Sequence, residues 1–250
     1  MFIRCLNFPF LINSWLSARI IFIGFVVLTM SAGAQNVDDI LTQHFEKVNI
    51  EAKSKITSLK YTGKSIQMGK ELPFSQVITN SAQNRLDVLF QGDTMTQAFD
   101  GKNGWMIAPW LGSKKPIDLT LNEAKTLKDQ ANIPGDLYEW DTKGFRLEYI
   151  DKEKVNDHIV DKLKLTKSEE EISVYLVDRN SKMIQKIISM SEDTIISVTH
   201  FKDYRSVNNI MFPFQMDIEY NGNIVSSIRL AKIELDIKID DTFFTKPVLE

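Results

Sequence analysis

Alternation of apolar and polar side chains dominates this chain from Thr57 onward, and this period of two limits what the chain can fold into. In the clearest run, Leu86, Val88 and Phe90 alternate with Arg85, Asp87 and Leu89. Successive side chains of a strand point to opposite faces of a sheet, so the pattern predicts half-buried β-strands. Gln91-Gly92-Asp93 and Asp100-Gly101-Lys102-Asn103-Gly104 supply tight turns before the predicted strands Thr94–Phe99 and Trp105–Trp110.

The same alternation returns after residue 144, where strand-like segments follow one another with no helix between them. They are Phe145–Ile150, Ile159–Thr166, Ile172–Val177, Met183–Met190, Thr194–Tyr204, Phe212–Tyr220 and Ile224–Ile237. Asn221-Gly222, between the last two, is the strongest hairpin dipeptide in the chain. Because helices do not alternate with strands, we expect one antiparallel sheet of about ten or eleven strands, which is large enough to curl or split.

Two segments have the spacing of amphipathic helices instead. The first ends before Tyr61 and has an apolar face made of Val37, Ile40, Leu41, Phe45 and Val48. Thr120 and Glu123 form an S/T-x-x-E capping box that opens the second, and this helix stops before Pro134-Gly135. The predicted fold class is therefore mainly β (α+β), with a large curved antiparallel sheet accompanied by two or three helices.

The first 34 residues have the layout of a secretory signal peptide. Arg4 and Arg19 are the only charged residues there, an apolar stretch runs from Ile20 to Met30, and Ala32-Gly33-Ala34 supplies small residues. We predict cleavage after Ala34, which leaves residues 35–250 as a single domain in the periplasm. The alternative is an uncleaved leader that anchors the chain to the inner membrane. Against it, about eleven helical residues reach only about 16 Å, and the hydrocarbon core is about 30 Å thick.

Composition narrows the classes of function. Loss of two arginines with the leader changes the formal net charge from −3 to −5, which disfavours nucleic acid as a partner. Cys5, the only cysteine, lies upstream of the apolar stretch and not just after it, where the lipidated cysteine of a lipoprotein would lie. The domain after the leader has no thiol for disulfides, nucleophilic catalysis or metal ligation.

The sequence contains no evident catalytic or metal-binding motif, so we expect neither an enzyme nor a bound metal or cofactor. His44, His158 and His200 are isolated and lack the spacing of a zinc site. There is no G-x-S-x-G, P-loop or dinucleotide fingerprint. Glu169-Glu170-Glu171 is typical of a solvated turn, but a glycosidase carboxylate pair is defined by distance across a cleft, so a hydrolase stays open as an alternative.

Bulky apolar side chains are concentrated in the predicted strands between residues 86 and 110. A packed core is the simplest interpretation, but a curved sheet crossed by one helix can leave part of its concave face unfilled. On that hypothesis, the residues of an apolar ligand-binding cavity are Leu86, Val88, Phe90, Phe99, Trp105, Ile107 and Trp110. A lid helix would contribute Ile40, Leu41, Phe45 and Val48.

Several segments resemble the periplasmic outer-membrane lipoprotein carrier proteins, the LolA-like family. The family's D-G-x-x-x-W-x-x-x-P hairpin resembles Asp100-Gly101-Lys102-Asn103-Gly104-Trp105-Met106-Ile107-Ala108-Pro109. Val177-Asp178-Arg179 to Ile184 resembles its D-x-x-x-x-x-I strand pair. A later hairpin of the family resembles Phe201-Lys202-Asp203-Tyr204-Arg205 with Phe212-Pro213. The family's closing segment resembles Asp241-Thr242-Phe243-Phe244-Thr245-Lys246-Pro247. The likeness covers nearly all of residues 35–250 and depends on the order of the motifs.

The resemblance implies an incomplete β-barrel whose apolar concave face is lidded by helices. It also implies a carrier that receives acyl chains of lipoproteins, or other lipids, from an inner-membrane ABC-type release complex and needs no cofactor. We expect such a carrier to act as a monomer. A regulatory or protein-binding module on the same scaffold is the alternative function.

One position departs from the family pattern. The family has a gating arginine that precedes a proline ahead of the D-G hairpin, whereas Ser81-Ala82-Gln83-Asn84-Arg85 contains no proline. Either Arg85 takes the gating role from a shifted position, or this role is absent.

Overall fold

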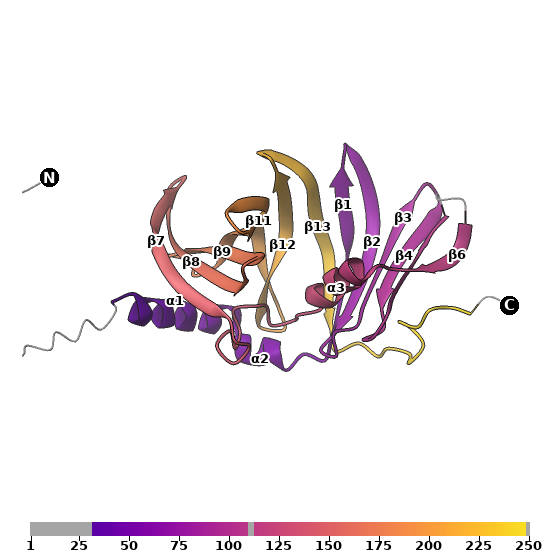
Figure 1. Cartoon of the computed structure of the whole chain (residues 1–250), viewed down its shortest axis with the longest axis horizontal. Coiled ribbons are helices and arrows are strands. Elements are labelled where there is room, and N and C mark those ends of the chain that lie inside the picture. The colour runs from indigo at the N-terminus through magenta and orange to yellow at the C-terminus, as the bar shows by residue number, and fades with distance from the viewer. Residues whose placement is uncertain (1–31, 110–112, 249–250) are drawn as a thin grey trace, which may run out of the picture. The chain divides into compact units, whose positions relative to one another are not determined.

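A computed structural model of the protein describes residues 32–109 and 113–248 (Figure 1). Most of the predicted leader, and the cavity candidate Trp110, lie outside the described residues. Three helices are present in the described ranges: α1 (Ala32–Val48), α2 (Ile50–Ser54) and α3 (Leu121–Gln130). None of them is both long enough and apolar enough to cross a lipid bilayer.

Thirteen strands form a single antiparallel sheet in the described part of the chain. The first six are β1 (Ser58–Gln67), β2 (Lys70–Thr79), β3 (Asn84–Phe90), β4 (Asp93–Phe99), β5 (Gly104–Ala108) and β6 (Ser113–Asp118). The others are β7 (Arg146–Val155), β8 (His158–Ser168), β9 (Glu171–Asp178), β10 (Ile184–Ser191), β11 (Thr194–Val207), β12 (Ile210–Tyr220) and β13 (Asn223–Leu235).

The strand order is β6-β5-β4-β3-β2-β1-β13-β12-β11-β10-β9-β8-β7. Two meanders therefore meet where β1 pairs with β13, and β6 and β7 remain as unpaired edges at opposite ends of the sheet (Figure 1). This confirms the predicted fold class, a large antiparallel sheet that forms an incomplete β-barrel with few helices. The expected number of about ten or eleven strands was too low. The sequence pattern predicts no strand in residues 58–79 or 113–118, because lysines and prolines interrupt the apolar pattern there.

The start of the second predicted helix and the last predicted hairpin turn are found at the expected residues, whereas α1 begins at Ala32, before the predicted apolar face. The Thr120 hydroxyl accepts a hydrogen bond from the Glu123 backbone N–H at 3.3 Å, and the Thr120 N–H donates to the Glu123 carboxylate at 2.8 Å. Both bonds of the predicted capping box are therefore present. Asn221, in the turn between β12 and β13, has a positive φ of 49°. Asparagine and glycine tolerate this conformation well, which explains the hairpin.

A β-bulge between Thr62 and Gly63 shifts the register of β1 against β13 near the centre of the sheet. Bulges bend the strand that carries them and increase its twist. A Cβ atom at Gly63 would lie 2.2 Å from the Arg229 carbonyl oxygen, so only glycine fits at this close approach.

Gly63→Ala should therefore destabilise the protein by about 1–3 kcal/mol, because the new methyl group forces the two central strands apart. The free energy of unfolding from urea denaturation measures this effect. Lys64→Ala, a change on the exposed side of the same strand, should stay within about 0.5 kcal/mol of the wild type. Equal stabilities of the two variants would contradict the close packing of β1 on β13.

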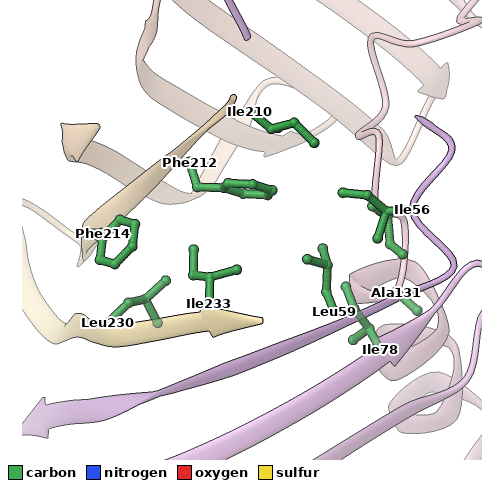
Figure 2. Close-up of a cluster of buried hydrophobic side chains, with 10 residues drawn as sticks. Ile56, Leu59, Ile78, Ala131, Ile210, Phe212, Phe214, Leu230 and Ile233 are labelled. Carbon is green, nitrogen blue, oxygen red and sulfur yellow. The ribbon is translucent and has the colours of Figure 1, made fainter. Parts of the chain in front are cut away.

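The main core lies where the two meanders meet, and it gathers side chains from both (Figure 2). Its buried members are Ile56, Leu59, Ile78, Ala131, Ile133, Ile210, Phe212, Phe214, Leu230 and Ile233. Leu59 on β1 is fully buried and pairs across the sheet with Ile78 and Leu235. This cluster joins the central strands to α2 and to the segment that follows α3.

A second core lies under α1. Three residues of the predicted apolar face, Val37, Ile40 and Leu41, pack with Leu137 and with side chains of β7, β8 and β9. The sheet residues of this cluster are Leu147, Leu163, Leu165, Tyr175 and Val177. α1 therefore covers the β7–β9 part of the sheet.

Candidate functional site

The cavity with the most apolar wall lies over five adjacent strands, β3, β2, β1, β13 and β12, and has a volume of about 560 Å³. Ligand pockets typically measure about 300–1,000 Å³, so this volume suits a ligand of moderate size. The apolar side chains that line it are Tyr61, Leu72, Phe74, Leu86, Val88, Ile133, Phe212, Met216, Ile218, Ile228 and Leu230.

Strand pairing explains why these side chains meet. Residues that lie opposite each other in an antiparallel pair share one face of the sheet. Val88 lies opposite Phe74, and Ile228 lies opposite both Ser65 and Met216. One face of the five strands is therefore apolar over most of the cavity.

The polar residues of the cavity wall are largely bonded to one another. The Ser65 and Ser226 hydroxyl oxygens lie 3.1 Å apart. The Gln76 side-chain amide donates to the Asn84 side-chain oxygen at 3.1 Å and to that of Gln130 at 3.4 Å. Because these groups already have partners, a ligand in the cavity meets mainly carbon atoms.

A second cavity, of about 290 Å³, lies next to the first under α1 and α2. Phe45 and Val48 of α1 contribute to its lining, together with apolar residues of β10–β12. The two cavities share four lining residues: Lys53, Asn132, Gly135 and Pro213. They therefore adjoin at the end of α2.

The structure brings two of the predicted cavity residues, Leu86 and Val88, into the larger cavity. Phe90 lies beyond it at the end of β3, where the Lys70 ammonium is 5.7 Å from its ring centre. Phe99 is buried opposite Asn84, whose side-chain amide donates to the Leu127 carbonyl of α3 at 2.8 Å. Phe99 therefore lies on the face that α3 covers.

Trp105 and Ile107 lie on the opposite face of the sheet from Leu86. Trp105 is opposite Ala98, which in turn is opposite Arg85, the neighbour of Leu86 along β3. Since adjacent residues of a strand point to opposite faces, Trp105 faces away from the cavity. Ile107 pairs with Thr96 on that same outer face. Neither residue lines the larger cavity, so the prediction that Trp105 and Ile107 belong to it was wrong.

The C-terminal segment covers this outer face. The Trp105 indole N–H donates to the Phe244 carbonyl at 2.8 Å, and Trp105 is only 2% exposed. Arg85 forms an ion pair with Asp87 at 3.0 Å, donates to the Phe243 carbonyl at 2.8 Å and stacks 4.7 Å from the Phe243 ring centre. Arg85 is thus tied to the closing segment of the chain.

Trp105→Phe should lower the free energy of unfolding by about 1–2 kcal/mol, because it leaves the Phe244 carbonyl without its donor. It should leave the affinity for an acyl probe unchanged, since Trp105 faces away from the cavity. Thermal unfolding and a probe titration on the same sample check both parts. A loss of probe affinity without loss of stability would mean that Trp105 does line the binding site.

Two of the predicted lid residues on α1 line a cavity, and the other two belong to the core under the helix. Phe45 and Val48 line the second cavity. Ile40 and Leu41 are 8% and 5% exposed and belong to the core under the helix. Any movement of α1 away from the sheet would therefore expose core side chains as well as cavity walls.

The histidine and the two carboxylates that line the second cavity have partners within the protein. Burial lowers the pKa of His44 to about 4, and its Nδ1 lies 2.7 Å from the Lys182 carbonyl. Asp129 and Asp136 line the second cavity, and each is paired with a lysine, Lys125 and Lys167, at 2.7 Å and 2.6 Å. No group of three or more metal-ligating side chains occurs within the described ranges.

Sequence reasoning missed most of the cavity wall, which comes from β1, β2, β12 and β13. A signal was present in β12, where Phe212, Phe214, Met216 and Ile218 recur at every second position. The pattern identified the strand but not the hollow in front of it. The contribution of α2, including Lys53, had no sequence signal because its five residues are too few for an amphipathic pattern.

Comparison with known proteins shows the fold. No protein-family model matches the sequence, and a search of curated proteins finds no match either. Among solved structures, a LolA superfamily protein from Nitrosomonas europaea is similar, with a TM-score of 0.56 and 14% identity over 82% of this chain and 97% of that one. A domain of a candidate outer membrane lipoprotein-sorting protein from Vibrio parahaemolyticus has a TM-score of 0.54 and 9% identity, covering 83% and 95% of the two chains.

A third similar structure is a DUF1329 family protein from Desulfovibrio piger, with a TM-score of 0.52 and 12% identity over 82% of this chain and 96% of that one. These matches cover most of the chain and nearly all of each neighbour. The protein therefore has the LolA-like fold, as the sequence motifs predicted.

Proposed function

We propose that this protein is a non-catalytic periplasmic carrier that binds acyl chains of lipoproteins, or related lipids, for transfer to the outer membrane. The observation that supports this most strongly is the cavity of about 560 Å³ with an apolar wall on the inner face of an open sheet. Leu86 and Val88 would contact the acyl chain there, and α1, which lines the adjoining second cavity through Phe45 and Val48, would act as the lid of that second cavity.

The energetics favour such a cavity in a carrier. An acyl chain of about sixteen carbons exposed to water is disfavoured by about 0.8 kcal/mol per CH₂, or about 12 kcal/mol in all. A carrier must offer comparable burial and must also release its ligand. An open sheet partly covered by helices satisfies both conditions, because the apolar face is formed by rigid strands and access depends on a smaller movable element.

The carrier proposal includes a location for the protein in the periplasm and a loading partner in the inner membrane. Residues 1–34 would be a signal peptide removed after Ala34, so that the carrier works as a monomer between the two membranes. An inner-membrane ABC-type complex would load it. The intact mass of the protein isolated from a periplasmic extract tests the signal-peptide cleavage. The mass of a chain that begins at Gln35 supports cleavage, whereas the mass of the full chain, found in the membrane fraction, supports an anchor.

Native mass spectrometry tests the carrier function itself. Protein purified gently from the periplasm should carry acylated cargo, and after delipidation it should bind a fluorescent fatty-acyl probe and a synthetic lipopeptide. An empty protein that binds neither would contradict the proposal. Capture of a membrane protein without any lipid would favour the alternative of a protein-binding module.

A further inference from the structure

An unpaired lysine lies where the two cavities adjoin. Lys53, on the short helix α2, lines both of them. Its Nζ lies 5.7 Å from the centre of the Phe212 ring, at the wall of the larger cavity. An ammonium group at this range is attracted to the ring face, and this contact fixes its position at the junction.

The ammonium of Lys53 has no anionic partner. Across residues 32–109 and 113–248, neither a hydrogen bond nor an ion pair reaches its Nζ. The two carboxylates that line the second cavity are taken up elsewhere, Asp129 by Lys125 and Asp136 by Lys167. By contrast, Lys55, two residues further on, pairs with Glu51 at 2.7 Å.

Burial acts on this lone charge. Removal from water lowers the pKa of Lys53 to about 8, so the side chain is still mostly protonated at pH 7. Lys53 is partly buried, and an ammonium that is partly removed from water without an anionic partner is unfavourable. A negatively charged ligand atom beside it would relieve this penalty more than a neutral acceptor would, because hydrogen bonds between oppositely charged groups are stronger.

We propose that Lys53 binds the anionic head group of a single-chain amphiphile, a carboxylate or a phosphate, whose acyl chain occupies the larger cavity. The inference rests on the proposed carrier function and narrows its ligand class. The chain would extend from Lys53 past Phe212 toward Met216 and Ile228. A neutral lipid of the same length would fit the walls but leave the ammonium without an anionic partner.

Three probes with the same hexadecyl-length chain test the proposal: palmitate, hexadecyl phosphate and hexadecanol. Each is titrated into wild-type protein, Lys53→Met and Lys55→Met by competition with one fluorescent acyl probe. A charge-assisted hydrogen bond should make wild type and Lys55→Met prefer an anion over hexadecanol by about tenfold. Lys53→Met should lose that preference, whereas Lys55→Met should bind all three probes as the wild type does.

The outcomes separate this inference from the carrier function. If hexadecanol binds and neither anion binds more tightly, the carrier function stands and the role of Lys53 is overturned. The role of Lys53 is also overturned if Lys53→Met keeps the preference for an anion over hexadecanol. If no probe binds the wild type, the proposed function fails as well. The anion that binds more tightly identifies the source, a fatty acid for palmitate and a lysophospholipid for hexadecyl phosphate.

The pH dependence gives an independent readout. The preference for palmitate should be present at pH 7 and decline above about pH 8, as Lys53 loses its proton. Other groups face the cavities, but His44, with a pKa of about 4, is already neutral, and burial raises the pKa of Tyr61, Tyr175 and Tyr204. Asp129 and Asp136 stay paired with lysines. A preference that is constant to pH 9.5 would overturn the assignment.

Discussion

Val88→Trp should weaken the binding of a long-chain acyl probe by roughly fifteenfold. Val88 lines the larger cavity, opposite Phe74 on the neighbouring strand, so an indole at this position would fill part of the space that the chain needs. Each CH₂ group kept out of the cavity weakens binding by about 0.8 kcal/mol, and two of them by about 1.6 kcal/mol. Competition titration against a fluorescent fatty-acyl probe measures the change.

Leu89→Trp is the matched control for this experiment. Leu89 is the next residue along β3, points to the other face and is 45% exposed. The same substitution there should leave the probe affinity within about twofold of the wild type, because the indole faces water. Equal losses in the two variants would mean that β3 does not form a wall of the binding site.

Leu59→Ala should reduce the free energy of unfolding by about 2–5 kcal/mol. Leu59 is fully buried at the centre of the main core (Figure 2), and its removal leaves a space that the surrounding strands cannot close. Leu86→Ala, the same chemical change on the cavity wall, should reduce it by only about 1 kcal/mol or less, because Leu86 already borders empty space. Urea denaturation of both variants measures the difference.

The comparison of these two leucine variants distinguishes a hollow sheet from a filled one. If Leu86→Ala were as destabilising as Leu59→Ala, Leu86 would be a core residue with close neighbours on every side. The cavity would then be smaller than about 560 Å³, and the carrier proposal would lose its main support.

Local features of the fold could be predicted from the sequence. Alternation identified most of the strands, the Thr120 capping box marked the start of α3, and Asn221-Gly222 marked the last hairpin. Each of these signals is contained in a few neighbouring residues. The pairing of β1 with β13 joins residues such as Tyr61 and Ile233, which lie far apart in the sequence, so no local pattern could reveal it.

The candidate site was harder to predict for the same reason. Alternation separates the two faces of a strand, but it does not say which face is concave. Leu86 and Trp105 are both large and apolar, yet one borders the cavity and the other is covered by the C-terminal segment through Phe244. That cover comes from residues far along the chain. The position of Lys53 could not be predicted either, because only the folded chain brings its ammonium beside Phe212.

The most direct measurement is methyl-resolved NMR of the protein with a palmitoyl ligand. Intermolecular NOEs should connect the acyl methylenes to the methyl groups of Leu86, Val88 and Ile228, which line the larger cavity. The methyl signals of Leu163 and Leu165, buried in the core under α1, should show no such contacts. Methyl signals of the cavity residues that stay unchanged at saturating ligand, or NOEs confined to other surfaces, would contradict an acyl-binding cavity on the inner face of this sheet.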